Sequence, residues 1–279
     1  MSTPLNTTID TKTLRAVIDG DVLVYRCGFA ADAQARGDFL DHNPDASAEE
    51  VAEHLEEYDY LRYALANVKG VIQDIQEIFN RNVVLYLTGQ GNFREHMATI
   101  LPYKGNRDTA HRPKYYKEIK AYMIDVWNAV VVEGREADDA LSCDLWQDRE
   151  GTVLVTIDKD LDNTPGWHYN WVKKELYYVD EATADRNFWL QVLTGDRTDN
   201  IQGIPGIGPA KAAKIMADAS DWFEYAAAAL TAYEKAFGDK AESYLYENAS
   251  LLWMQREEGV NFDDQPYKFE EHPEELTDE

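Results

Sequence analysis

LTGDRTDNIQGIPGIGPAKAAKI, from Leu193 to Ile215, is the stretch of sequence that indicates most about the fold. Asp196 and Asp199 stand three residues apart, so on a helix they would share one face and reach the same ion. Glycines that cannot continue a helix follow at once: Gly203, Gly206 and Gly208. They suit a tight turn whose bare backbone can approach a ligand closely.

The end of this stretch predicts a second helix over residues 210–217. Its unpaired N-terminal N–H groups, with Lys211 and Lys214 nearby, would bind phosphate oxygens without reading bases. The two helices and their turn therefore predict a helix-turn-helix variant for sequence-neutral binding of a nucleic-acid backbone. The alternative is a glycine-rich connector between two ordinary helices.

This segment resembles the helix-three-turn-helix of the flap endonuclease and 5'-exonuclease family. The pattern of that family is Gly-Asp, two residues, Asp-Asn and then a hairpin rich in glycine and proline, which residues 195–200 and 203–214 match. The resemblance extends over about residues 14–252. It implies a PIN/resolvase-like α/β domain with further acids at strand ends, a helical arch, and K⁺ as a further candidate ion at the helix-three-turn-helix.

Acidic residues follow three short apolar runs that we expect to be strands. Leu14–Ile18 leads to Asp19, and Val130–Val132 and Val153–Ile157 lead to the others, which are Glu136, Asp138, Asp139, Asp158 and Asp160. Ligands in open α/β sheets bind at the carboxyl ends of the strands, so these acids are expected to face one cleft. Taken singly, acids in a first helical turn can simply complement the helix dipole, and Asp-rich turns are common.

Together with Asp196 and Asp199, these acids would place eight carboxylates around one cleft. Mutual repulsion would raise several of their pKa values unless cations were bound, and all-oxygen ligands select Mg²⁺ or Mn²⁺. Two such ions about 4 Å apart can drive phosphodiester hydrolysis. By resemblance, Glu136, Asp138 and Asp158 with Asp160 serve a first ion that the strand-end acids share. Asp196 and Asp199 serve the second, and Asp19 and Asp158 are counted as catalytic.

The chain departs from the family pattern at the end of the expected second strand. The family has an aspartate there, in Phe-Asp-Gly, and Phe-Arg a few residues later. This chain has Thr88 in that place, and Phe93 and Arg94 keep the later landmark. A hydroxyl carries no charge, so the departure predicts a lower metal affinity or a shifted set of ligands.

The notable basic stretch of the chain runs from Arg94 to Lys120. It holds seven Lys or Arg against three acids, a local balance of +4 in a chain of net charge −25. Tyr103 to Arg107 within it resembles the start of the family's helical arch, where the lysine and arginine, here Lys104 and Arg107, contact the scissile phosphate. Tyr103 is expected to stack on a terminal base. Arg94 is a further DNA-binding candidate, and the alternative for Lys104 and Arg107 is a solvated surface face.

The overall acidity would by itself argue against a nucleic-acid partner. The distribution of the acids resolves this conflict, because residues 38–59 hold nine acids without Lys or Arg and residues 257–279 hold ten. We expect these runs to be solvated faces or a loose tail, with a DNA mimic or a docking segment for a basic replication partner as the alternative. DNA binding should be salt-sensitive through few phosphate contacts.

The expected architecture is an α/β domain over residues 1–180, with a mainly parallel sheet flanked by helices and a basic arch at about 93–127. A helical DNA-binding domain follows over residues 181–279, with the helix-three-turn-helix at about 193–217 and an acidic tail. Strands are expected near 14–19, 83–88, 129–132 and 153–157, and helices near 21–35, 48–79, 113–127 and 137–149. No apolar run approaches a membrane-spanning length, so we expect a cytoplasmic protein. Its small size resembles the stand-alone phage type of the family, which implies a monomer at work within a bacterial host.

The resemblance implies a 5'-to-3' exonuclease with flap endonuclease activity that cuts DNA near 5' ends, flaps and duplex–single-strand junctions, with RNA–DNA hybrid as a further candidate substrate. A role in replication, primer removal or recombination follows by analogy only. A PIN-type endoribonuclease would share the acidic site without needing the glycine hairpin. A non-catalytic protein that binds DNA junctions is the alternative of another class, which Thr88 leaves open.

Overall fold

The computed structural model describes residues 9–80, 82–106 and 112–265. Its strands and helices, in chain order, are β1 (Arg15–Asp19), α1 (Gly20–His42), α2 (Ala48–Glu57), α3 (Leu61–Ile78), β2 (Val83–Thr88), α4 (Phe93–Met97), α5 (Tyr116–Trp127), β3 (Val130–Val132), α6 (Ala137–Gln147), β4 (Thr152–Val155), β5 (Gly166–Asn170), β6 (Glu175–Val179), α7 (Glu181–Thr194), α8 (Pro209–Ile215), α9 (Trp222–Phe237) and α10 (Ala241–Leu252). Within these ranges, no helix combines the length and the apolar character needed to cross a bilayer.

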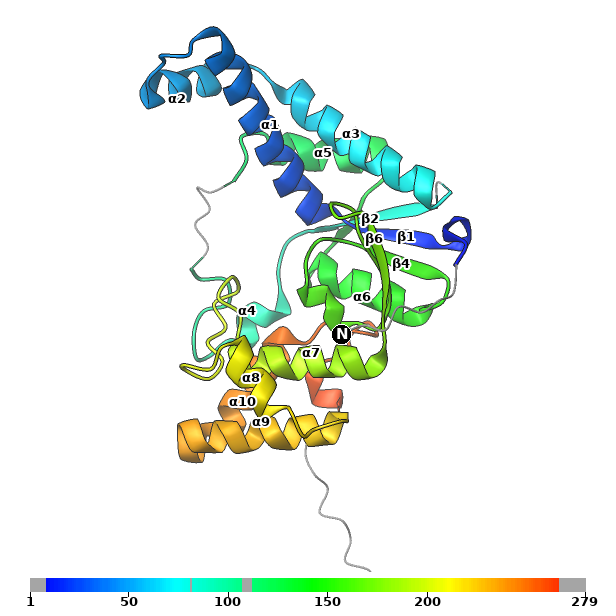
Figure 1. Cartoon of the computed structure of the whole chain (residues 1–279), viewed down its shortest axis with the longest axis vertical. Helices are drawn as coiled ribbons and strands as arrows, with labels where there is room; N and C mark the ends of the chain where they lie inside the picture. Colours follow the sequence, from blue (N-terminus) through cyan, green and yellow to red (C-terminus); the bar gives the residue numbers. More distant parts are fainter. Residues whose placement is uncertain (1–8, 81, 107–111, 266–279) are drawn as a thin grey trace, which may run out of the picture.

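The six strands form one sheet in the order β3-β2-β1-β4-β5-β6. All neighbours are parallel except β5 and β6, which pair antiparallel. The sheet is covered on both faces, with α1, α3 and α5 on one side and α6 on the other (Figure 1). The predicted fold class, a mainly parallel sheet flanked by helices, is confirmed.

The central strand β1 shows why both faces are covered. Its side chains alternate between the two faces, and Ala16, Val17 and Ile18 are all fully buried. Ala16 and Ile18 join the apolar cluster beneath α1 and α3, whereas Val17 joins Leu141 and Leu145 of α6. A strand that is apolar on both faces needs a helix layer on each, as parallel sheets do.

Two local features differ from the sequence-based expectation. The expected single helix over residues 48–79 is broken into α2 and α3. Between them the backbone of Tyr58 is extended, and the buried side chain of Tyr60 donates its hydroxyl to Asp32 Oδ1 at 2.8 Å. The hairpin of β5 and β6 was not predicted. Its residues are rich in aromatic side chains, a signal typical of strands that could have revealed it.

The helices after residue 180 gather around a second apolar cluster. Trp189, Phe188 and Tyr233 are fully buried in it, and Trp222 packs against it. Tyr225 of α9 is also buried in this cluster and Phe237 packs against it, whereas Phe223 of the same helix is exposed. A domain boundary near residue 180 stays a prediction.

The strand order creates a switch point at the centre of the sheet. From β1 the chain continues to β2 and β3 on one side, and then returns to β4, β5 and β6 on the other. In such sheets a crevice opens beyond the carboxyl ends of the strands that flank the reversal. Those ends are Asp19 of β1 and the segment that follows Val155 of β4.

Candidate active site

A cleft of about 1200 Å³ opens at this edge of the sheet. Its walls come from the start of α1, the segment after β2, α5 and the start of α6. Three groups of acids that follow strands line it, namely Asp19 with Asp21, Glu136 with Asp138, and Asp158, together with Glu95 of α4. Acids from three distant parts of the sequence therefore meet in one hollow, as the strand-end pattern predicts.

Asp19 lies at the bottom of the cleft and caps α1. Its side chain is 2% exposed, Oδ1 accepts the Val22 N–H at 3.0 Å, and Oδ2 accepts the Thr156 hydroxyl at 2.8 Å. Burial raises the pKa of Asp19 to about 7, with smaller upward contributions from the charges of Asp21 and Asp158. A buried carboxyl among like charges favours a bound cation.

Asp138 and Glu136 enter the cleft from the start of α6. Burial, and then the charges of Asp19, Glu136 and Asp158, raise the pKa of Asp138 well above its usual range. Glu136 is held from three sides: Asn92 donates to Oε1 at 2.9 Å, the Tyr103 hydroxyl donates to Oε2 at 3.1 Å, and Lys104 pairs with Oε1. The two acids thus differ, since Glu136 is already neutralised and Asp138 is not.

A second group of acids lies alongside the first. Asp160 shares a hydrogen bond with Asp196, and burial, followed by the charges of Asp158, Asp196 and Asp199, raises the pKa of Asp160 to about 8. By resemblance we expected Asp160 to serve the first ion. The charges of both groups act on Asp160, so it lies near both, and its assignment to one ion stays a prediction.

Asp196 and Asp199 are not on a helix, which corrects the local reasoning that brought them together. Helix α7 ends at Thr194, and Asp196 forms an isolated antiparallel bridge with Ile201, with N–H to O distances of 2.8 and 2.7 Å. Asp199 lies in the turn enclosed by this bridge. A closed turn, rather than a helix face, therefore places the two carboxylates.

The glycines of this segment serve different purposes. A Cβ on Gly195 would lie 2.3 Å from the Ile201 carbonyl oxygen, and a Cβ on Gly203 would lie 2.3 Å from the Gly195 nitrogen. Gly203 is buried, and its backbone packs closely against Gly195. The prediction that Gly203 contacts DNA is therefore wrong. Gly206 and Gly208 are exposed with open space around them, and remain candidates.

The predicted second helix of this segment is α8, which runs from Pro209 to Ile215. Lys211 and Lys214 are exposed on it, and Lys211 Nζ donates to the Gly206 carbonyl at 2.8 Å. Both lysines are therefore accessible to a DNA backbone, and their phosphate contact stays a prediction.

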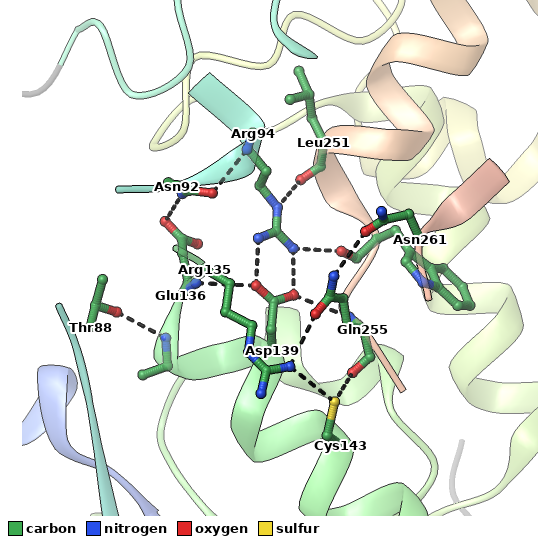
Figure 2. A network of polar contacts seen from close by, with 12 residues as sticks. Thr88, Asn92, Arg94, Arg135, Glu136, Asp139, Cys143, Leu251, Gln255 and Asn261 are labelled. Carbon is green, nitrogen blue, oxygen red and sulfur yellow. Dashed lines mark hydrogen bonds and ion pairs between the residues drawn. The ribbon is translucent and has the colours of Figure 1, made fainter. Parts of the chain in front are cut away.

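Arg94 and Asp139 pair with each other in the interior (Figure 2). Their side chains are 1% and 0% exposed, and two parallel bonds of 2.7 Å join the guanidinium to the carboxylate. Arg94 also donates to the carbonyls of Leu251 and Trp253, at 2.9 and 2.6 Å. The predictions that Arg94 binds DNA and that Asp139 binds metal are thus corrected. The ion pair links α4 to α6, and the bonds from Arg94 to the two carbonyls link α4 to the end of α10. Each of the two charged side chains thus has its partner inside the protein.

Tyr103 is also buried, at 8% exposure, which corrects its expected stacking on a terminal base. Its hydroxyl is 2.8 Å from Asp199 Oδ2 and 3.1 Å from Glu136 Oε2. Lys104 lies beside it at the cleft, with Nζ paired to Glu136 and 3.5 Å from Asp199 Oδ2. Tyr103 and Lys104 therefore connect the acids of α6 to those of the closed turn. Arg107, their expected partner, lies outside the described residues.

The donor set fits a hard divalent cation in its chemistry. The candidate ligands are carboxylates, and burial, followed by the charges of neighbouring acids, raises the pKa values of Asp19, Asp138 and Asp160. As the described side chains stand, no three acids, histidines or cysteines converge closely enough to hold an ion together. Several of their oxygens are instead held by protein donors such as Lys104 and Thr156.

Sequence reasoning missed four residues that shape the cleft. Asn92 orients Glu136, Thr156 binds Asp19, and Lys120 of α5 and Asp21 of α1 lie together at the end of β2. Asp21 had a visible signal, because it follows Asp19 and Gly20 in the same acidic motif. Lys120 was visible only as the end of the basic stretch, and the contacts of all three could not be foreseen because their partners are distant in sequence.

Fold and site together define a three-layer α/β protein with an acidic cleft at the switch point of its sheet. Among solved structures, the chain is similar to the zinc-bound 5'-exonuclease of T5, with 19% identity, a TM-score of 0.55, and coverage of 86% of this chain and 89% of that chain. It is also similar to the bacteriophage T5 flap endonuclease in complex with DNA and metal ions, with 18% identity, a TM-score of 0.56, and coverage of 85% and 88%. The chain therefore has the fold of the T5 5'-exonuclease.

Sequence comparison adds a shorter match. The DNA polymerase I of Rhizobium leguminosarum is 34% identical over 104 residues. The match covers 33% of this chain but only 10% of that polymerase. No protein-family model matches the chain.

Proposed function

We propose that this protein is a metal-dependent 5'-to-3' deoxyribonuclease that hydrolyses phosphodiester bonds near 5' ends, flaps and junctions. The observation that carries the proposal is the meeting of Asp19, Asp138 and Asp158 at the switch point, beside the turn of Asp196 and Asp199. The fold shared with the T5 enzymes supports it, since those structures include complexes with DNA and with metal ions.

The residues that would hold divalent ions fall into two neighbouring groups. Asp19, Asp138 and Asp158 form one, and Asp160, Asp196 and Asp199 form the other. Mg²⁺ or Mn²⁺ is the expected cofactor, and when bound it would activate a water on one side of the phosphodiester and stabilise the departing oxygen on the other. K⁺ near the closed turn is a further candidate on resemblance alone.

We propose that Lys104 binds the phosphate. Its ammonium lies in the cleft between the two groups of acids, where it contacts Glu136 and Asp199. A phosphate entering the cleft would offer it a further partner, and an ammonium there stabilises negative charge that develops on the phosphate oxygens. Tyr103 would keep Glu136 and Asp199 oriented when Lys104 turns from these acids to the phosphate, because its hydroxyl contacts both carboxylates.

Digestion of end-labelled flapped, duplex and single-stranded DNA tests the proposal, with Mg²⁺ and with EDTA. We expect cleavage from the 5' end in Mg²⁺ only. Asp158→Asn should abolish cleavage and spare DNA binding, whereas Asp239→Asn, in an exposed turn after α9, should leave cleavage unchanged. Normal turnover by Asp158→Asn would remove Asp158 from the site.

Lys104→Ala tests the phosphate-binding step. We expect cleavage to slow by about 10²-fold, the scale of losing one donor that stabilises the transition state. Lys69→Ala, which removes an exposed lysine of α3, is the matched control and should have no effect. A normal rate for Lys104→Ala would leave the lysine with a structural role only.

The same substrates separate the two alternatives. Internal cuts in RNA with no preference for 5' ends would favour a PIN-type endoribonuclease. Tight binding to junctions with no turnover in Mg²⁺ or Mn²⁺ would favour a non-catalytic scaffold. Activity on an RNA–DNA hybrid would support a role in primer removal.

A further inference from the structure

Thr88 stands at the end of β2, where the resemblance predicts an aspartate. Its hydroxyl accepts the N–H of Ala137, the first residue of α6, at 2.9 Å (Figure 2). The hydroxyl thus satisfies an N–H group that has no partner within the helix. Thr88 therefore has a structural task and brings no negative charge to the cleft.

A carboxylate reaches the same point from another element. Asp21, in the first turn of α1, accepts the backbone N–H of Thr88 on Oδ2 at 2.9 Å. Its side chain is 27% exposed and lines the cleft together with Asp19, Asp138 and Asp158. The side chain of Thr88 carries no negative charge, but the carboxylate of Asp21 is bound to the backbone of Thr88 and supplies one at the same place.

Lys120 of α5 completes this arrangement. Its Nζ donates to the Thr88 carbonyl at 2.6 Å and lies 3.7 Å from Asp21 Oδ1. The pair is partly exposed, with the lysine side chain at 21%, so the lysine can release Asp21 at modest cost. It acts as the countercharge of Asp21 when no cation is present.

We propose that Asp21 is a ligand of the divalent ion, directly or through water, and replaces the carboxylate that Thr88 lacks. The inference rests on the proposed function and adds to it a residue that the family pattern does not assign. It makes two demands on the protein. Removing the charge of Asp21 must weaken metal binding, and restoring a charge at residue 88 must compensate.

Mn²⁺ binding to the full chain, followed by calorimetry and by electron paramagnetic resonance without DNA, provides the test. Asp21→Asn keeps an oxygen for the Thr88 N–H and removes only the charge. We expect it to weaken Mn²⁺ binding by about tenfold or more, on the scale of losing a group that supports a metal site. Adding Thr88→Asp should restore most of the affinity. Glu118→Gln, which removes an exposed acid from α5, is the matched control and should not change it.

Three outcomes would overturn the inference. The first is Mn²⁺ binding by Asp21→Asn that equals that of wild type. The second is a loss that Thr88→Asp does not restore, because Asp21 would then act through local structure. The third is a Lys120→Gln variant that binds Mn²⁺ no more tightly than wild type, because removing the countercharge of Asp21 should tighten binding in the wild-type background and have no effect once Asp21 is changed. This variant also decides the matter if Asp21→Asn does not fold.

The proposed function and this inference fail in different ways. A wild-type protein that neither binds Mn²⁺ nor cleaves DNA would defeat both. A wild-type protein that binds and cleaves, with an Asp21→Asn variant that behaves alike, would defeat the inference alone.

Discussion

Replacing Arg94 by Met should destabilise the protein strongly, because the change leaves Asp139 charged and alone in the interior. The pair is 1% and 0% exposed and is joined by two bonds of 2.7 Å. Breaking a buried ion pair from one side costs about 3–5 kcal/mol. The carbonyls of Leu251 and Trp253 also lose a donor. We therefore expect a loss of about 4 kcal/mol, which for a chain of this size lowers Tm by about 10 °C.

Thermal and urea unfolding followed by circular dichroism measure this loss. Arg149→Met is the control, because its pair with Glu181 spans 3.5 Å between side chains that are 37% and 59% exposed, and such surface pairs contribute about 1 kcal/mol or less. The double change Arg94→Met with Asp139→Leu removes both charges and should recover much of the stability.

Two results would refute this reasoning. One is an Arg94→Met variant with the same stability as the Arg149→Met control. The other is a folded double variant that needs far more Mg²⁺ for cleavage than wild type, because Asp139 would then be a metal ligand after all. Unchanged Mg²⁺ dependence would instead support the structural role of the pair.

Three further outcomes follow from the structure. The pKa of Asp19 rises from 3.8 to about 7 on folding, so Asp19 alone should remove up to about 4 kcal/mol of unfolding free energy from the metal-free protein as pH rises from 4 through 7. Asp138 and Asp160 also have raised pKa values, so urea titrations without metal should show a smaller fall in Asp19→Asn than in wild type, and an equal fall in both would contradict the prediction. Gly195→Ala should lower the free energy of unfolding by about 1–3 kcal/mol, because the φ of Gly195 is +69° and a Cβ there would meet the Ile201 carbonyl. Gly37→Ala in α1, which has open space around it, is the control and should be neutral or stabilising. Equal melting temperatures of the two variants would refute the close approach of Gly195 to Ile201. Lys211→Ala should weaken DNA binding alike on all sequences and lower the slope of log K against log salt by about 1 in anisotropy titrations, and an unchanged slope would remove this lysine from the DNA contact.

Much of the fold follows from local patterns. The strands β1, β2, β3 and β4 are apolar runs that lie within two residues of their expected limits. For β1 and β4 the reason is that a strand covered on both faces must be apolar throughout. Asp19, Asp138 and Asp158 could be assigned to one cleft from sequence, since parallel strands present their carboxyl ends at one edge. The hairpin of β5 and β6 was missed although its residues are rich in aromatic side chains, because neither strand is apolar throughout.

Neighbouring residues in the site show where local reasoning stops. Asp138 and Asp139 are adjacent and chemically identical, yet Asp138 faces the cleft and Asp139 faces Arg94. Tyr103 and Lys104 are likewise adjacent, and only the tyrosine is buried against α6 and the closed turn. Which of two neighbours meets solvent depends on what packs against them.

The sequence by itself determined the α/β class, the strand ends that carry acids, and the glycine-rich segment with its exposed lysines. These features depend on spacing within a few residues, and the chain displays that spacing directly. Only the tertiary structure decided that Arg94 and Asp139 neutralise each other, that Gly203 packs on Gly195, and that Asp21 stands at the main chain of Thr88. The physical reason is that a charge or a backbone group takes its role from its nearest partner, and these partners, apart from the two glycines, come from parts of the chain that lie far apart in sequence.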